Sequence, residues 1–242
     1  MDPIFEKERR ENIKKLSRDK KLKKTALQFI AESFPDRYSY NFDWLGMPII
    51  QYPQDIIALQ EIIWKVKPDL IIETGIARGG SLIFSASMLE LIGGAGKVVG
   101  IDIDIREQNH REIEKHPLMK RIVMIEGSSI DEAVVRRVRA FATGKHRVLV
   151  YLDSNHSHAH VLQELAWYSP LVTKGSYLVV FDTIAEYLPH GLIVDRPWGK
   201  GNSPATAVRE FLKTHKNFAV DADMDAKLAI TVAPGGWLKR IR

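Results

Sequence analysis

Short apolar segments alternate with amphipathic segments along most of this 242-residue chain. Five apolar segments are typical of buried strands, and each is followed by a stretch with helical spacing or by a turn. They are residues 69–73, 97–102, 121–125, 147–152 and 176–181. This alternation predicts a doubly wound α/β fold with a mostly parallel sheet, in which ligands bind at the carboxyl ends of the strands.

The N-terminal part of the chain has a different pattern. Residues 1–33 have helical spacing that ends close to Pro35. Residues 40–53 form a connector rich in aromatic residues, whose prolines and glycine argue against regular structure. Because those aromatic side chains need burial, we expect the connector to pack across the domain or against a neighbouring subunit. We therefore divide the chain into a helical extension with connector, residues 1–54, and a ligand-binding domain, residues 55–242.

The C-terminal end carries two further strand-like segments. Residues 218–220 and 228–232 are apolar and are separated by an acidic turn. This arrangement predicts an antiparallel final pair, so the last strand of the sheet should run against the others.

Charge is concentrated at one end of the chain. The formal net charge is +5, and residues 1–24 carry 10 Lys and Arg against 5 Asp and Glu, so the remainder is neutral. A neutral body argues against nucleic acid as a partner. The mixed signs at helical spacing instead favour a helix that contacts solvent or another subunit, and we expect a homo-oligomer.

The composition restricts the cellular compartment that we expect and excludes chemistry that depends on cysteine. The chain has no cysteine, so disulfides and thiolate metal sites are excluded. Apolar runs such as residues 177–181 are far too short to span a bilayer, and residues 1–24 do not have the pattern of a signal peptide. We expect a soluble, cytoplasmic protein without a membrane span.

The first predicted strand runs into a turn with the features of a cofactor cradle. Glycines at a strand-to-helix turn let a ligand approach backbone N–H groups closely. The residues that we assign to cofactor binding here are Glu73, Gly75, Ala77, Gly79, Gly80 and Ser81.

Two acidic residues indicate which cofactor the cradle binds. Glu73 would repel a pyrophosphate but suits the amino group of S-adenosylmethionine. Asp102 ends the second predicted strand, where a carboxylate can bind both ribose hydroxyls. Together they favour S-adenosylmethionine over NAD; taken singly, Glu73 could cap a turn and Asp102 could be a solvated loop residue. Ser128 and Ser129 follow the third strand, and either reads the adenine edge or caps the next helix.

The fourth and fifth strands end in residues suited to catalysis. Asp153 and Asp182 follow these strands and provide two oxygen donors for Mg²⁺, and Asp153 is also expected to contact the cofactor. His156 lies three residues after Asp153, where an imidazole can take a proton from a hydroxyl near neutral pH. His158 and His160 are interpreted as solvated or packing residues, since their spacing with His156 does not place three rings on one helix face for zinc.

Residues 195–204 form a predicted loop with an aromatic side chain and cations. Arg196 and Trp198 suit a flexible lid over the substrate, and a plain surface loop is the alternative.

Several of these motifs together resemble the cephalosporin hydroxylase family over residues 40–242. They are Trp44-Leu45-Gly46-Met47-Pro48, Glu73-Thr74-Gly75, Gly79-Gly80-Ser81, Asp153-Ser154-Asn155-His156, residues 176–183, Arg196-Pro197-Trp198-Gly199 and residues 230–240. The resemblance implies a class I methyltransferase fold and an S-adenosylmethionine-dependent O-methyltransferase. The implied acceptor is a sugar or sugar-like hydroxyl of a glycolipid, a polysaccharide or a natural product.

The resemblance also implies roles for individual residues. Asp153 and Asp182 match ligands of Mg²⁺, and His156 matches the general base. Relatives that bind Mg²⁺ often have Glu-Asp where this chain has Phe181-Asp182. Metal dependence is therefore weakened or lost, unless Glu186 supplies the missing carboxylate.

Two other functions fit the sequence. One is an oxygenase component of natural-product biosynthesis, which the family name suggests, although the histidine cluster offers no clear two-histidine, one-carboxylate iron site. The other is a cofactor-binding partner protein without catalysis, in which the N-terminal helix and the connector serve assembly.

Overall fold

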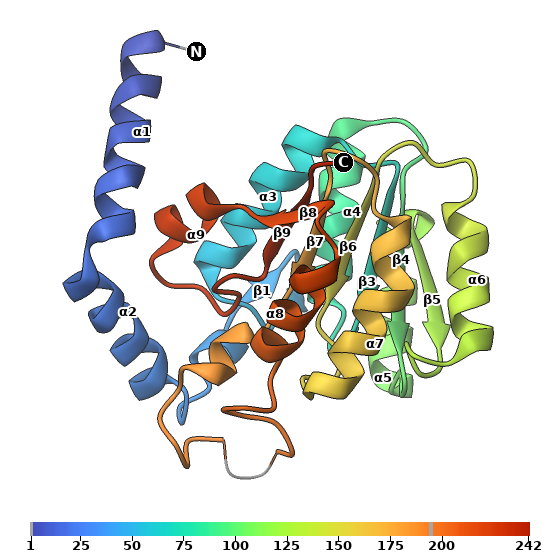
Figure 1. The fold of residues 1–242 in the computed structure, drawn as a ribbon. Coiled ribbons are helices and arrows are strands. Elements are labelled where there is room, and N and C mark those ends of the chain that lie inside the picture. Colours follow the sequence, from blue (N-terminus) through green and yellow to red (C-terminus); the bar gives the residue numbers. More distant parts are fainter. Residues whose placement is uncertain (1, 194–195) are drawn as a thin grey trace.

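The computed structural model describes residues 2–193 and 196–242, and a seven-stranded sheet lies at its centre (Figure 1). Its strands are β3 (Leu70–Thr74), β4 (Lys97–Asp102), β5 (Ile122–Glu126), β6 (Val148–Leu152), β7 (Tyr177–Val180), β8 (Phe218–Val220) and β9 (Trp237–Arg240). Their order across the sheet is β5-β4-β3-β6-β7-β9-β8. The five strands from β5 to β7 are parallel, and β9 runs antiparallel to both of its neighbours. The predicted doubly wound sheet with an antiparallel last strand is confirmed.

Helices cover both faces of the sheet. On one face lie α3 (Pro53–Val66), α4 (Gly80–Ile92) and α5 (Glu107–Lys115). On the other lie α6 (Glu132–Ala142), α7 (His158–Tyr168) and α8 (Pro204–Thr214). Successive residues of β3 alternate between the two cores, since Ile71 packs in the first while Leu70 and Ile72 pack in the second. Both faces are thus buried, as near-continuous apolar strands require.

The final strand pair differs from the expectation at one position. Residues 228–232 do not form a strand, because α9 (Ala222–Leu228) begins at the side-chain cap of Asp221 and the partner of β8 is β9. The backbone N–H of Val232 donates instead to the carboxylate of the buried Asp55, at 2.9 Å. Its hydrogen bond is therefore satisfied outside the sheet, which a local strand pattern does not reveal.

The N-terminal segment is helical as predicted, but it is divided in two. Asp19 ends α1 (Pro3–Arg18) and caps α2 (Lys20–Ser33) by accepting from the N–H of Leu22 at 2.8 Å. Both helices lie along the side of the domain that carries α9, and α1 extends beyond the domain (Figure 1). No helix among residues 2–193 and 196–242 is long and apolar enough to cross a membrane.

The aromatic connector is more regular than predicted. β1 (Asp43–Trp44) and β2 (Met47–Pro48) form a small antiparallel hairpin whose turn residues, Leu45 and Gly46, have φ of +48° and +85°. Trp44 packs edge-to-face on Phe84 of α4, with ring centroids 4.9 Å apart. The connector therefore packs across the domain, one of the two arrangements expected. Four short 3₁₀ helices complete the described elements: Tyr38–Tyr40, Met119–Arg121, Ser169–Leu171 and Thr183–Glu186.

Candidate active site

Acidic residues gather where four neighbouring parallel strands end. Asp102 is the last residue of β4, Asp153 follows β6 directly, and Asp182 lies two residues after β7. Thr74, the last residue of β3, is in register with Ile101 on one side and Leu152 on the other. All three carboxylates therefore lie at the edge of the sheet where parallel α/β folds bind ligands.

The turn between β3 and α4 requires glycine, because of its backbone angles and because other segments lie close to it. Gly75 has φ +91°, and a Cβ there would overlap the backbone oxygen of Asp153. Gly79 has φ +88°, and a Cβ on Gly80 would overlap the backbone of Pro48 in β2. Glycine at these positions brings the turn against two other segments, so the cradle predicted from the sequence is a tightly packed turn.

Glu73 is a buried acid with an unsatisfied oxygen. The residue is 2% exposed, and its Oε1 accepts a hydrogen bond from the hydroxyl of Ser81. Its Oε2 has no partner among the described residues. Burial raises the pKa of the Glu73 carboxyl to about 8, against which the hydrogen bond from Ser81 acts. A buried carboxylate with a free oxygen suits a cationic group such as the ammonium of S-adenosylmethionine.

Asp102 supports the same turn from the next strand. Its Oδ2 accepts from the backbone N–H groups of Ile76 and Ala77, at 2.8 Å and 3.1 Å. Its Oδ1 accepts from the N–H of Asp104 at 3.2 Å. Asp102 is therefore bonded to the cradle rather than simply solvated, and its predicted contact with a ribose stays a prediction.

The serines after β5 do not cap the next helix. Asp131 is the N-cap of α6, and its side chain accepts from the N–H groups of Ala133 and Val134. Ser128 is half-buried, and Ser129 is buried at 5% exposure with its hydroxyl 3.0 Å from Nε2 of His160. The alternative that remains for these serines is contact with the cofactor.

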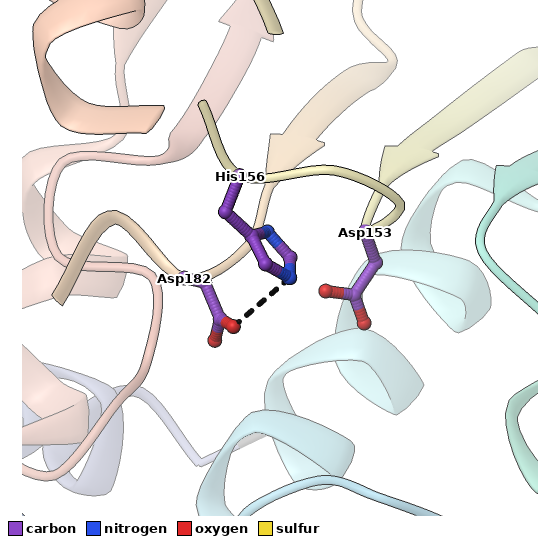
Figure 2. Close-up of side chains that lie close together, drawn as sticks. All are labelled: Asp153, His156 and Asp182. Atoms are coloured by element: carbon purple, nitrogen blue, oxygen red, sulfur yellow. Dashed lines mark ion pairs between the residues drawn. The ribbon is translucent and has the colours of Figure 1, made fainter. Parts of the chain in front are cut away.

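Asp153, His156 and Asp182 converge on one point (Figure 2). One ligand atom from each lies within 4.8 Å of the others, and Nε2 of His156 is 3.2 Å from Oδ2 of Asp182. Asp182 has φ +53°, a left-handed backbone conformation that is uncommon outside glycine. The sequence prediction that two strand ends direct these three side chains together is matched by this geometry.

The charge of Asp153 is poorly compensated within the protein. Desolvation of the carboxyl raises its pKa well above the usual range, and the like charge of Asp182 raises it further. The amide of Gln51, in the connector, donates to Oδ2 of Asp153 at 3.0 Å. Two carboxylates and an imidazole this close are a donor set that fits a divalent cation such as Mg²⁺.

Phe181 and Glu186, which the sequence analysis considers together with the metal site, make their contacts outside it. Phe181 is 2% exposed and packs edge-to-face between Tyr151 and Trp237, so it belongs to the core. Glu186 accepts from the N–H of Gly201 at 2.9 Å and from the hydroxyl of Ser203 at 2.7 Å. The alternative in which Glu186 supplies the missing carboxylate has no support here, because these bonds hold its side chain to another loop.

The predicted lid is an ordered turn over its described length, residues 196–204; Asp195 lies outside the described residues. Gly199 and Asn202 exchange backbone hydrogen bonds of 2.9 Å and 3.0 Å. The side chain of Asn202 accepts from the N–H of His158 at 2.9 Å. Trp198 lies edge-to-face against His156 at 5.1 Å, while the exposed Arg196 stacks on Trp198 at 5.3 Å. This loop is therefore fixed against the candidate base rather than extended into solvent.

Sequence reasoning missed two features. Gln51 contacts Asp153 across 102 positions of the chain, which no local pattern reveals. The sequence pattern predicts a solvated or packing residue at His160, yet the ring joins Ser129 to Glu164; the signal in the sequence is the four-residue spacing of His160 and Glu164 on α7. His158 does pack, with Nδ1 2.8 Å from the hydroxyl of Thr206 on α8.

Comparison with known structures agrees with this fold. A structure of CmcI with Mg and SAM has a TM-score of 0.60 at 20% identity, covering 84% of this chain and 78% of that one. The O-methyltransferase TomG from Streptomyces achromogenes, in complex with SAM, has a TM-score of 0.53 at 17% identity, covering 80% of each chain.

Sequence comparison identifies the family. The model of the rhamnosyl O-methyltransferase/CmcI family matches residues 36–241. A rhamnosyl O-methyltransferase of Mycobacterium leprae is 32% identical over 221 residues, covering 87% of this chain and 90% of the relative. Its counterpart in Mycobacterium bovis is 30% identical and covers 87% and 85%. The chain therefore belongs to the rhamnosyl O-methyltransferase/CmcI family of S-adenosylmethionine-dependent O-methyltransferases, as the resemblance in its sequence predicts.

Proposed function

We propose that this protein transfers the methyl group of S-adenosylmethionine to a hydroxyl of a sugar, with a rhamnosyl group as the first acceptor to test. The observation that carries the proposal is the placement of a cofactor cradle beside a base flanked by carboxylates. Glu73, with its unpaired buried oxygen, lies on β3, and Asp153 and His156 follow the adjacent strand β6. The names of the mycobacterial relatives support a sugar acceptor.

The donor would lie along the strand ends. Glu73 would pair with its ammonium, Asp102 would bind the ribose, and Ser128 and Ser129 would face the adenine. Gly75, Gly79 and Gly80, which have no Cβ, would let the donor contact the backbone of the turn together with Ala77 and Ser81. The donor's methyl group would then lie toward the carboxylates at the end of β6.

The acceptor side of the site contains the base. His156 would take the proton of the acceptor hydroxyl while the oxygen attacks the methyl carbon in line, and the sulfur leaves as S-adenosylhomocysteine. Asp182, 3.2 Å from the imidazole, would orient it and stabilise the imidazolium that forms. Trp198 packs against the ring of His156 and limits its rotation. Arg196 and Trp198 would also border the acceptor.

Asp153 and Asp182 would hold a Mg²⁺ ion, with His156 beside it. When bound, the ion lowers the pKa of a hydroxyl near it and orients that hydroxyl. The same donor set disfavours the oxygenase alternative, since the group formed by the described residues contains one histidine and two carboxylates.

Cofactor binding should release a proton. With a pKa of about 8, Glu73 is mostly protonated at pH 7, and pairing with an ammonium requires its carboxylate form. We expect the affinity for S-adenosylhomocysteine to fall by roughly tenfold per pH unit between about pH 7.5 and pH 6, because protonation of Glu73 competes with binding. Calorimetry in buffers of different ionisation enthalpy measures the released proton directly.

The matched control is Glu73→Gln, which cannot ionise. Its affinity should be weaker at pH 8 and independent of pH over this range, and no proton release should remain from this position. A wild-type affinity that does not change with pH would contradict the pairing of Glu73 with the ammonium. Binding of NAD in place of S-adenosylhomocysteine would contradict the proposed cofactor.

Magnesium should bind between the carboxylates of Asp153 and Asp182, beside His156. We expect calorimetric titration of the wild type with MgCl₂ to show one site, and Asp182→Asn to remove it, since the cluster loses one of its two carboxylate charges. Glu210→Gln is the control, because Glu210 lies outside the cluster and is half-exposed beside His158. Equal Mg²⁺ binding by the wild type and Asp182→Asn would exclude Asp182 as a ligand.

Self-association stays a prediction. Ile4 and Phe5 of α1 are 70% and 55% exposed, which leaves apolar side chains on this helix available to a second copy. Light scattering of the full chain measures the oligomeric state.

A further inference from the structure

A histidine outside the proposed catalytic group joins the loops after β5 and β6. Nε2 of His160, in the first turn of α7, lies 3.0 Å from Oγ of Ser129 and 3.2 Å from Oγ of Ser154. It also lies 3.6 Å from Oε1 of Glu164, one turn further along the same helix. One ring nitrogen is therefore shared by two hydroxyls and a carboxylate.

This network is largely closed to solvent. Glu164 has no exposed surface, and Ser129 is 5% exposed. The hydroxyl of Tyr168 donates to the backbone oxygen of Ser129 at 2.7 Å, which fixes the loop around it. Oε2 of Glu164 has no partner among the described residues, so its carboxylate depends on the groups around Oε1. A buried carboxylate of this kind requires hydrogen-bond donors among the groups that contact it directly.

The partners around Nε2 of His160 favour one arrangement of the hydrogens. The hydroxyl of Ser154 donates its single hydrogen to Oε1 of Glu164 at 2.7 Å, so Ser154 can only accept from His160. The nearby carboxylate also favours a hydrogen on Nε2 of His160. Ser129 then accepts from the same N–H; the acceptor that the network offers its own hydroxyl hydrogen is Oγ of Ser154, at the long distance of 3.5 Å, so that hydrogen stays available to a ligand.

We propose that His160 and Glu164 are positioning residues that set the hydroxyl of Ser129 as a hydrogen-bond donor to N1 of the cofactor's adenine. This inference rests on the proposed function, which places Ser129 beside the adenine. N1 of adenine is an acceptor, whereas N1 of hypoxanthine carries a hydrogen. A donor fixed at this position therefore selects adenine and rejects hypoxanthine.

The test compares S-adenosylhomocysteine with S-inosylhomocysteine, which differ in this base. For the wild type, calorimetry should give a Kd about tenfold lower for the adenine compound, the typical effect of one hydrogen bond. His160→Ala should reduce this preference to nearly none. His160→Gln should keep most of it, because the glutamine amide can donate from nearly the same place.

A double-mutant cycle shows whether His160 acts through Ser129. Ser129→Ala should remove the preference, and adding His160→Ala to it should cause no further change in the ratio of the two Kd values. Gln163→Ala, on the exposed side of α7, is the control and should keep the wild-type ratio. Melting temperatures of all variants identify any that fail to fold, and His160→Gln and Ser129→Ala keep the test decisive in that case.

The outcomes separate this inference from the proposed function. Wild-type binding of both compounds with equal affinity would overturn the inference and leave the proposed function intact, as would an unchanged preference in Ser129→Ala or His160→Ala. Binding of neither compound by the wild type would overturn both.

Discussion

His156→Ala is expected to lower the rate of methyl transfer by about 10²–10⁴-fold, the contribution of a positioned general base. The Kd for S-adenosylhomocysteine should stay within about twofold of the wild type, because the ring contacts Asp182 and Trp198 rather than the cradle. Steady-state kinetics under saturating donor and calorimetry of the product measure the two quantities separately.

His146→Ala is the matched control for this substitution, since His146 is exposed in the turn before β6 and takes no part in the site. It should leave both the rate and the affinity unchanged. Turnover of His156→Ala at the wild-type rate would remove His156 from the mechanism. A parallel loss of cofactor affinity would instead indicate that the substitution disrupts the cradle.

Gly75→Ala should have the largest effect on stability. A left-handed backbone costs a non-glycine residue roughly 1–2 kcal/mol, and overpacking a close contact costs about 1–3 kcal/mol more. Gly75 incurs both, because it has φ +91° and its Cβ would overlap the backbone oxygen of Asp153. We expect the free energy of unfolding in urea to fall by about 3 kcal/mol or more, with loss of cofactor binding.

Gly94→Ala separates the two causes. Gly94 also has a positive φ, +75°, but nothing lies within 4 Å of a Cβ placed there. It should lose only the backbone contribution, about 1–2 kcal/mol, and keep its affinity for S-adenosylhomocysteine. Equal losses in the two variants would mean that the close approach of Gly75 to Asp153 does not constrain the cradle.

Much of the fold follows from local pattern. The buried strands β3 to β7 are continuous apolar runs, and each was predicted to within one or two residues of its observed ends. The pattern predicts a strand at residues 228–232 because they are apolar and are separated from residues 218–220 by an acidic turn. The observed loop there depends on Asp55, which lies 177 positions away from Val232 and binds its N–H. A local sequence pattern does not encode that contact, because the two residues are far apart in the chain.

The candidate site likewise contains residues that the sequence pattern could place and residues that it could not. Residues at strand ends, such as Asp153 and Asp182, could be placed together because parallel strands share one carboxyl edge. Side chains that reach the site from elsewhere could not be placed. Gln51 comes from the connector, and Glu186 turned out to be bonded to the loop at residues 201–203. Pairwise contacts of this kind depend on tertiary packing, which local periodicity does not encode.

The most direct test of the proposed activity is transfer of an isotopically labelled methyl group from S-adenosylmethionine to a simple rhamnoside, with Mg²⁺ present and the product identified by mass spectrometry. We predict a rhamnoside carrying one labelled O-methyl group with the wild type and almost none with His156→Ala. Tight binding of S-adenosylmethionine without methyl transfer to the rhamnoside or to any other sugar hydroxyl in an acceptor panel would contradict the account.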